Sequence, residues 1–211
     1  MIFFYVIGHA ILVGFFLIER FVRKGSKDMS NTDFDKSSTK YISIVMGIAF
    51  ILLFLSPLLN YFLIGKITNM WVGIIGICLG VTGIIFRCVA FYTLGRFFTR
   101  TLQEKENHIL IMNGIYKYIR HPGYLSDMLI FSGVAMALCN WIPVLFVMFS
   151  YPIVYAYRIK TEERMLIDIF GEAYIHYQKR SWMVLPLFRG KQHYATGCAV
   201  SENDINHQYT R

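Results

Sequence analysis

The chain has 211 residues, of which 55% are hydrophobic and only 16% are charged, and its formal net charge is +8. Soluble domains carry about 25% charged residues. This composition excludes a disordered chain, a collagen-like chain and most soluble enzymes of this length.

Four long stretches contain no charged residue: residues 2–18, 41–65, 67–86 and 128–157. A helix needs about 20 mainly apolar residues, at a rise of ~1.5 Å each, to cross a bilayer. The first three stretches therefore predict one membrane-spanning helix each. The first is not expected to be a cleaved signal peptide, because no basic region precedes it and basic residues follow it.

The fourth stretch has 30 residues, which is too long for one span and too short for two. Asn140 and Pro143 mark a break within it, because Asn favours turns and Pro interrupts helices. Extending the stretch back to Pro122 and forward to Arg158 gives two spans of about 18 residues joined by a tight hairpin. The fourth span then contains one acid, Asp127.

The expected fold class is an all-α integral membrane protein with five transmembrane helices, a cytoplasmic catalytic loop and C-terminal helices. We expect a single membrane-embedded domain over residues 1–211, with spans at about 2–19, 41–64, 68–92, 122–139 and 142–160 and a polar tail at 191–211.

The distribution of Lys and Arg predicts the orientation of these spans. Residues 20–40 hold six of them, residues 96–120 hold five and residues 158–211 hold eight, whereas the other side has Lys66 alone. Positively charged loops stay in the cytoplasm, so we expect a multi-pass protein with its N-terminus outside and its catalytic loops and C-terminus in the cytoplasm. Topology and anionic membrane lipids then explain the net charge, and no nucleic-acid partner is predicted.

Glycines in the third span, Gly73, Gly76, Gly80 and Gly83, recur every three or four residues. This spacing favours close packing of two helices over a phosphate-binding loop, which needs a preceding strand. The four cysteines form no Cys-x-x-Cys pair and the tail histidines have no metal-ligand spacing, so no metal site is predicted. His9, in the first span, is interpreted as a packing residue.

The first segment that could carry chemistry is residues 108–124. Asn113-Gly114 predicts a turn, and Pro122 suits the first position of a helix. Arg120 and His121 would then lie at the mouth of the fourth span, where free amide groups and the positive end of the helix dipole meet the cytoplasm. The alternative is a basic anchor at lipid headgroups within a belt of interfacial tyrosines.

The second such segment is residues 155–177. If the fifth span continues as a helix past Arg158, Glu162 lies one turn further along the same face. The alternative is an ordinary Arg that extends to the membrane surface, together with a solvated Glu. Asp127 is a further candidate because ionisable residues inside spans are often functional, and the sequence leaves open whether it lines a lipid-side entrance or bonds to nearby backbone.

Taken together, the two segments resemble the isoprenylcysteine carboxyl methyltransferase family, a membrane family related to the phospholipid methyltransferases. The resemblance rests on Arg-His-Pro-x-Tyr at 120–124, Gly-Ile-Tyr at 114–116, Glu-Glu-Arg at 162–164 and Phe-Gly-Glu-x-Tyr at 170–174. It covers roughly residues 96–189, and the count of five spans is similar to that of the compact prokaryotic members.

The resemblance implies S-adenosylmethionine as the methyl donor, bound without a Rossmann fold between the span mouths and the C-terminal helix. It also implies that Arg158 holds the carboxylate of the substrate, and that one cofactor contact within residues 99–103 stays unassigned. The implied cofactor-binding residues are His108, Ile109, Leu110, Ile111, Tyr116, His121, Pro122, Gly123, Tyr124 and Glu162.

The expected function is therefore methylation, inside the membrane, of a lipophilic acceptor that enters from the bilayer, with a carboxylate of the prenylcysteine type as the expected group. A carboxylate is ionised at pH 7, because its pKa is about 4, so its attack on a sulfonium methyl needs no general base. The alternatives are an amine of a phospholipid or a thiol as acceptor, or a non-enzymatic membrane protein such as a transporter subunit. The oligomeric state is left open.

Overall fold

The computed structural model describes residues 2–25, 36–94 and 110–184. Within these ranges the regular structure is helical, with two isolated β-bridges. The elements are α1 (Ile2–Gly25), α2 (Lys36–Tyr61), α3 (Met70–Leu94), the short 3₁₀ helix η3 (Gly114–Lys117), α4 (Pro122–Ala137), α5 (Trp141–Phe170) and α6 (Glu172–Arg180).

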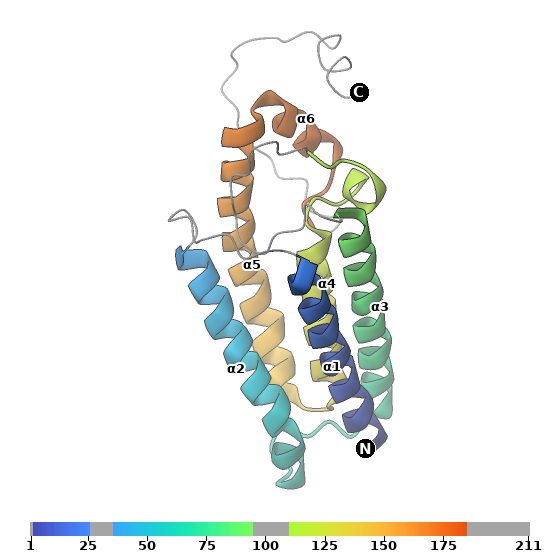
Figure 1. Ribbon diagram of the computed structural model, residues 1–211. Helices are drawn as coiled ribbons and strands as arrows, with labels where there is room; N and C mark the ends of the chain where they lie inside the picture. The colour runs from blue at the N-terminus through green and yellow to red at the C-terminus, as the bar shows by residue number, and fades with distance from the viewer. Residues whose placement is uncertain (1, 26–35, 95–109, 185–211) are drawn as a thin grey trace.

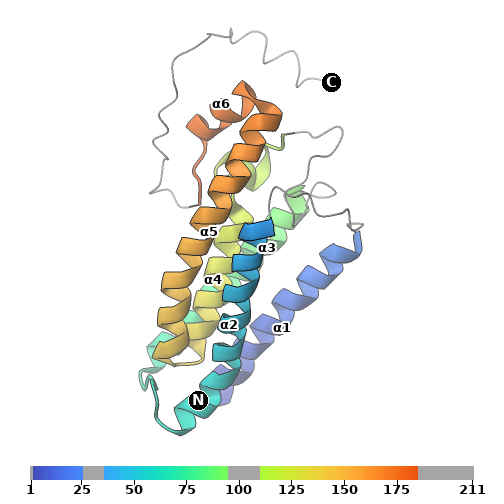
Figure 2. The same cartoon turned by 90° about the vertical axis from the view of Figure 1, so that its left-hand side faces the viewer.

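The helices α1 to α5 run lengthwise beside one another, and α6 crosses one end of the bundle (Figure 1). The start of α1, the α2–α3 connection and the α4–α5 connection lie at the opposite end in both side views (Figure 2). We call these the α6 end and the hairpin end. The start of α4 and the last turns of α5 lie together at the α6 end, so this end gathers both segments that the sequence singles out.

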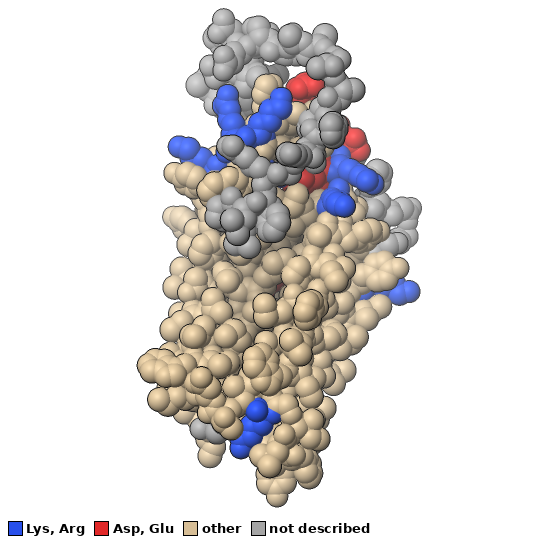
Figure 3. Space-filling model, turned by 180° about the vertical axis from the view of Figure 1, so that it is seen from behind, with Lys and Arg blue, Asp and Glu red and all other residues tan. Residues whose placement is uncertain are grey.

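Four of the described helices, α1, α2, α3 and α5, are long and apolar enough to cross a membrane. The face drawn in Figure 3 is uncharged over most of the bundle, with charged side chains concentrated towards the α6 end and a small basic patch at the hairpin end. The protein is therefore an integral membrane protein. The helix α4 has 16 residues, of which ten are buried, so its side chains face protein more than lipid. The count of five spans stays a prediction.

Small residues bring α3 and α4 into close contact. A Cβ atom added to Gly76 would lie 2.4 Å from the backbone nitrogen of Ala137, and one added to Gly83 would lie 2.8 Å from that of Ile130. On α4, a Cβ at Gly133 would meet the backbone nitrogen of Gly80 at 2.3 Å. No side chain fits at these distances, so the interpretation of the glycines as helix-packing residues is confirmed.

At the hairpin end, two asparagines connect the end of α2 to the turn between α4 and α5 by hydrogen bonds. Asn140, directly before α5, donates from Nδ2 to the Oδ1 atom of Asn60 at 2.8 Å and to the carbonyl oxygen of Ile64 at 2.9 Å. Asn60 donates in turn to the carbonyl oxygen of Leu138 at 2.8 Å and to the hydroxyl of Tyr5 at 2.9 Å. The turn between α4 and α5 therefore lies at the break that Asn140 predicts.

Candidate active site at the α6 end

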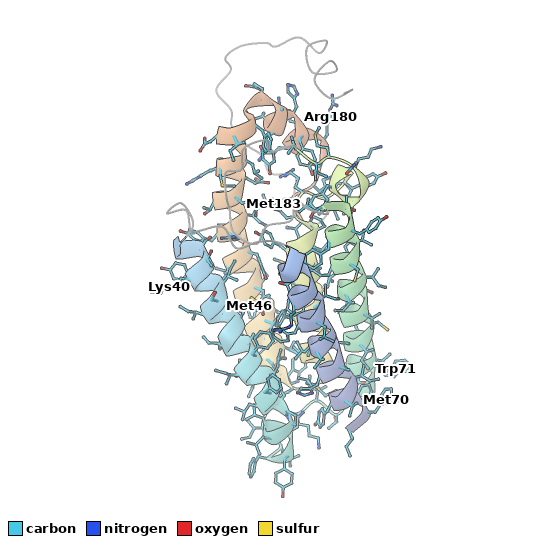
Figure 4. All side chains as sticks on the ribbon, viewed as in Figure 1. Lys40, Met46, Met70, Trp71, Arg180 and Met183 are labelled. Carbon is cyan, nitrogen blue, oxygen red and sulfur yellow. The ribbon has the colours of Figure 1, made fainter. Side chains whose placement is uncertain are left out.

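The strand-like segment before α4 is fixed to the chain that follows α6. The backbone nitrogen of Trp182 donates to the carbonyl oxygen of Tyr118 at 2.8 Å, and that of Arg120 donates to the carbonyl oxygen of Trp182 at 2.8 Å. The backbone nitrogen of His121 donates to Met183 at 3.1 Å. Figure 4 shows Met183 below α6 and inside the α6 end. Pro122 then begins α4, as predicted.

Arg120 points into the protein, with 7% of its surface exposed. Its Nε atom donates to Oε1 of Glu163 at 2.8 Å, and its Nη1 atom donates to the carbonyl oxygens of Ser181 at 2.6 Å and Gln178 at 3.0 Å. This arrangement does not fit a basic anchor at lipid headgroups. Arg120 instead ties the start of α4 to both α5 and the end of α6.

His121 is also buried, and it joins both acids of the Glu-Glu pair. Its Nε2 atom lies 3.3 Å from Oε1 of Glu163, and its Nδ1 atom lies 3.7 Å from Oε2 of Glu162. The imidazole is stacked on the ring of Tyr124, with centroids 5.5 Å apart and an angle of 13° between the planes. The first turn of α4 thus presents an aromatic face beside a carboxylate.

The helix α5 continues well past Arg158 and ends at Phe170, so Arg158 and Glu162 lie on one face as the spacing predicts. The hydroxyl of Tyr124 connects them: it donates to Oε2 of Glu162 at 2.6 Å and accepts from Nε of Arg158 at 3.2 Å. The predicted pair of residues therefore lies together with Tyr124 in the folded chain.

Arg158 is only 3% exposed, which excludes a side chain extended to the membrane surface. Its Nη1 atom donates to the hydroxyl of Ser38 at 2.8 Å and to that of Thr39 at 3.1 Å. Both hydroxyls belong to the first turns of α2. A guanidinium can bind a carboxylate through charge-assisted hydrogen bonds.

Tyr116 lies in η3, whose turn begins at Gly114 with a φ of +55°. The hydroxyl of Tyr177, on α6, donates to the carbonyl oxygen of Tyr116 at 2.5 Å. Burial, together with the negative charge of Glu162, raises the pKa of the Tyr116 phenol above its usual range. The phenol therefore stays protonated at neutral pH.

The structure brings together some of the residues that the sequence analysis proposes. Tyr116, His121, Tyr124, Arg158 and Glu162 lie within one region, and Pro122 and Gly123 form the turn that carries Tyr124. Leu110 and Ile111 are half-buried in the segment that leads to η3. His108, Ile109 and the unassigned contact at 99–103 lie outside the described residues.

Reasoning from the sequence missed several partners. Ser38 and Thr39 lie in a polar segment without any pattern, so no signal marks them. Glu163 and Arg120 both belong to the quoted motifs, and a search for opposite charges within those motifs would have paired them. Tyr155 begins the second candidate segment without an assigned role, and its hydroxyl donates to Asp127 at 2.9 Å. Asp127 therefore bonds to side chains. Neither of the two alternatives from the sequence, a lipid-side entrance or a bond to nearby backbone, includes such bonds.

The arrangement offers two adjacent sites of opposite charge. Glu162, next to the stacked rings of His121 and Tyr124, suits a cationic ligand, because carboxylates and aromatic faces both attract cations. Arg158, one helical turn away, suits a carboxylate. Among the described residues no three His, Cys, Asp or Glu side chains gather in a way that could hold a metal ion. Glu162 and Arg158 could therefore attract a cationic and an anionic group side by side.

Comparison with known proteins agrees with this chemistry. The model of the isoprenylcysteine carboxyl methyltransferase (ICMT) family matches residues 74–168. The chain is 37% identical over 118 residues to protein-S-isoprenylcysteine O-methyltransferase of Dictyostelium discoideum, covering 55% of this chain and 48% of that protein. It is 32% identical over 124 residues to the Homo sapiens protein of the same name, covering 57% and 43%.

A solved structure of a eukaryotic intramembrane Ras methyltransferase, ICMT, is similar in fold, with a TM-score of 0.61 and 25% sequence identity. The likeness covers 72% of this chain and 54% of that one. The chain spans about half the length of the curated relatives above. The matched segment 74–168 contains α4, Arg158 and Glu162, and within this segment the chain is similar to the isoprenylcysteine carboxyl methyltransferase family.

Proposed function

We propose that this protein is a membrane methyltransferase that uses S-adenosylmethionine to esterify the carboxylate of a lipophilic acceptor of the prenylcysteine type. The observation that carries the proposal is the buried Arg158, lined by hydroxyls and joined to Glu162 through the hydroxyl of Tyr124. The names of the relatives, protein-S-isoprenylcysteine O-methyltransferase, support the same reaction.

The residues near Glu162 fit S-adenosylmethionine. This cofactor carries positive charge and an aromatic base, and the region offers a carboxylate, two stacked aromatic rings and the protonated phenol of Tyr116. In this proposal Glu162 binds a polar group of the cofactor and His121, Pro122, Gly123 and Tyr124 surround it. Residues 108–111 line the adenosyl part. When bound, the cofactor supplies a methyl group activated by its sulfonium.

Arg158 would orient the acceptor. Its guanidinium attracts a carboxylate and repels an ammonium, so the buried cation favours an acid over a phospholipid amine as acceptor. Ser38 and Thr39 add hydroxyls that can donate to a carboxylate oxygen. Removing water from an ionised carboxylate that is held in place favours its attack on the methyl group without a base.

We infer that the α6 end faces the cytoplasm. Figure 4 shows Arg180 near this end and Lys40 beside the start of α2, on the side of the bundle away from Met70 and Trp71, which lie towards the hairpin end. Positive charge on the cytoplasmic side is the general rule for membrane proteins. The prenyl chain of an acceptor would then enter from the bilayer between the helices, with its carboxylate at the cytoplasmic interface.

Calorimetric binding of S-adenosylhomocysteine to the purified full chain in detergent tests the proposal, followed by methyl transfer to an S-prenylated cysteine with a free carboxylate. We expect saturable binding in the wild type and about tenfold weaker binding in Glu162→Ala, because one charged contact is lost. Asp168→Ala, an exposed acid on the same helix, is the matched control. Absence of binding by folded wild type, in detergent and in bilayers, would contradict the proposal.

A further inference from the structure

Three charged side chains form a buried cluster that the proposed chemistry does not use. Arg87 on α3, Glu19 on α1 and Asp127 on α4 are each 6% exposed. Arg87 donates from Nε to Oε1 of Glu19 at 3.0 Å, and its Nη1 atom lies 3.1 Å from Oδ1 of Asp127. The cluster joins three helices and combines one positive charge with two negative charges.

Burying such a cluster costs free energy, so it is an unfavourable way to hold helices together. Charges lose hydration when they are buried, and apolar residues of similar volume often pack at least as stably. Ionisable side chains on membrane helices are accordingly rare and often serve function. Arg87 also packs over the ring of Phe91, 4.6 Å from its centroid, so its guanidinium is held on several sides in one position.

The first connection from Arg87 to the site runs through the backbone of α4. Its Nη1 atom donates to the carbonyl oxygen of Gly123 at 3.0 Å, and the hydroxyl of Ser126 donates to the same oxygen at 2.6 Å. A Cβ atom at position 123 would lie 3.3 Å from this Nη1 atom, so glycine leaves room for the guanidinium. Gly123 directly precedes Tyr124 in the first turn of α4.

The second connection runs through Asp127. The hydroxyl of Tyr155 donates to Oδ2 of Asp127 at 2.9 Å. The ring centroids of Tyr155 and Tyr124 lie 5.0 Å apart. Tyr124 carries the hydroxyl that connects Glu162 and Arg158. Arg87 thus contacts the backbone next to Tyr124. Through Asp127 and Tyr155 it also supports the packing of the Tyr124 ring.

We infer that Arg87 is a positioning residue of the site. Held by Glu19 and Asp127, it fixes the first turn of α4 and the ring of Tyr155, and thereby places the Tyr124 hydroxyl between the proposed cofactor site and the proposed carboxylate site. The inference rests on the proposed function, because its first test uses S-adenosylhomocysteine as the ligand.

Arg87→Lys and Tyr155→Phe test the inference. A lysine keeps the charge, but its single ammonium cannot reproduce the fixed fork of a guanidinium toward two carboxylates and a carbonyl. We expect about tenfold weaker binding of S-adenosylhomocysteine by R87K, measured by calorimetry on the full chain, with a matching rise in KM for S-adenosylmethionine and a smaller change in kcat. Y155F, which loses one hydroxyl, is expected to weaken binding about threefold.

A double-mutant cycle separates positioning from general stability. In a Tyr124→Phe background, R87K should add less than about twofold to the loss of affinity, because the hydroxyl that Arg87 places is gone. Asn60→Ala, which removes buried hydrogen bonds at the hairpin end, should lower Tm and leave the Kd for S-adenosylhomocysteine unchanged. Equal affinity of R87K and wild type, or fully additive losses in the cycle, would overturn the inference.

Hydrogen exchange gives a readout that needs no ligand. R87K and Y155F should speed amide exchange at residues 119–125, whereas N60A should speed it only near residues 138–142. If wild type binds no S-adenosylhomocysteine, the proposed function fails and the exchange data still decide about Arg87. Unchanged exchange at 119–125 in both variants would then refute the positioning role.

Discussion

The two ends of the bundle hold buried polar groups of different kinds. At the hairpin end, Asn60 and Asn140 bond to each other and to the carbonyl oxygens of Leu138 and Ile64. These groups are neutral, and backbone carbonyls that end helices or form turns take up much of their hydrogen-bonding capacity. Their geometry explains how the chain reverses between helices.

At the α6 end the buried polar groups include many charged side chains. Arg120 pairs with Glu163, and Arg87 pairs with Glu19 and Asp127. Arg158 and Glu162 lie one turn apart and share the hydroxyl of Tyr124. The connections between helices at the hairpin end are held by neutral groups, so a tight connection between two helices does not require buried charges.

The difference indicates what each end is built for. Neutral amides satisfy the backbone at low cost, whereas buried charges lose hydration and contribute little net stability. A protein that needed stability alone would use the chemistry of the hairpin end at both ends. The concentration of charge at the α6 end therefore fits the binding of charged ligands there, and substitutions at the two ends should have separable effects.

The largest expected effect is that of Arg158→Ala on methyl transfer. Loss of a buried charged donor that orients the acceptor should reduce turnover of an S-prenylated cysteine about 100-fold, while binding of S-adenosylhomocysteine stays close to wild type. Lys160→Ala, an exposed cation on the same helix, serves as the control and should retain activity. A cofactor affinity that falls as far in R158A as in E162A would show that Arg158 belongs to the cofactor site instead.

Much of this fold could be predicted because a helix that crosses a bilayer must be long and mainly apolar. Long uncharged stretches predict the long helices, and the glycines at 76, 80 and 83 predict that α3 meets a partner at close range. Their partner, α4, was the hardest helix to recognise. It has 16 residues, carries Asp127 and Ser126, and is largely enclosed by protein, so its sequence need not match the hydropathy of lipid.

The site was predictable where its residues lie in the two segments that the motifs mark. Arg158 and Glu162 are four apart on one helix, and His121 and Tyr124 share the first turn of α4. Connections to residues outside the two segments were not predictable, because pairs such as Arg87 with Glu19 or Arg158 with Ser38 join parts of the sequence that no motif marks. Nothing local distinguishes Glu19 from a solvated acid at the end of a span.

A smaller effect, on stability alone, is expected for Asn140→Ala. The variant loses the side-chain cap at the start of α5 and the bonds to Asn60 and Ile64. Loss of a helix cap costs about 1 kcal/mol, and an unsatisfied buried partner costs about 1–3 kcal/mol. Tm measured in detergent should fall, with the affinity for S-adenosylhomocysteine unchanged. Weaker binding by N140A at temperatures where it is folded would show that the two ends are coupled.

The smallest expected effect is that of removing the hydroxyls of Ser38 and Thr39. The double variant S38A/T39V should raise KM for the prenylated acid about threefold, because each hydroxyl accepts a hydrogen bond from Arg158 and helps to hold its guanidinium in place. Binding of S-adenosylhomocysteine should not change. Ser43→Ala, whose hydroxyl bonds only within α2 at an exposed site, is the matched control. If the hydroxyls merely occupy the place of the acceptor carboxylate, their removal lowers KM instead, and α2 then closes the acceptor site without contributing to binding.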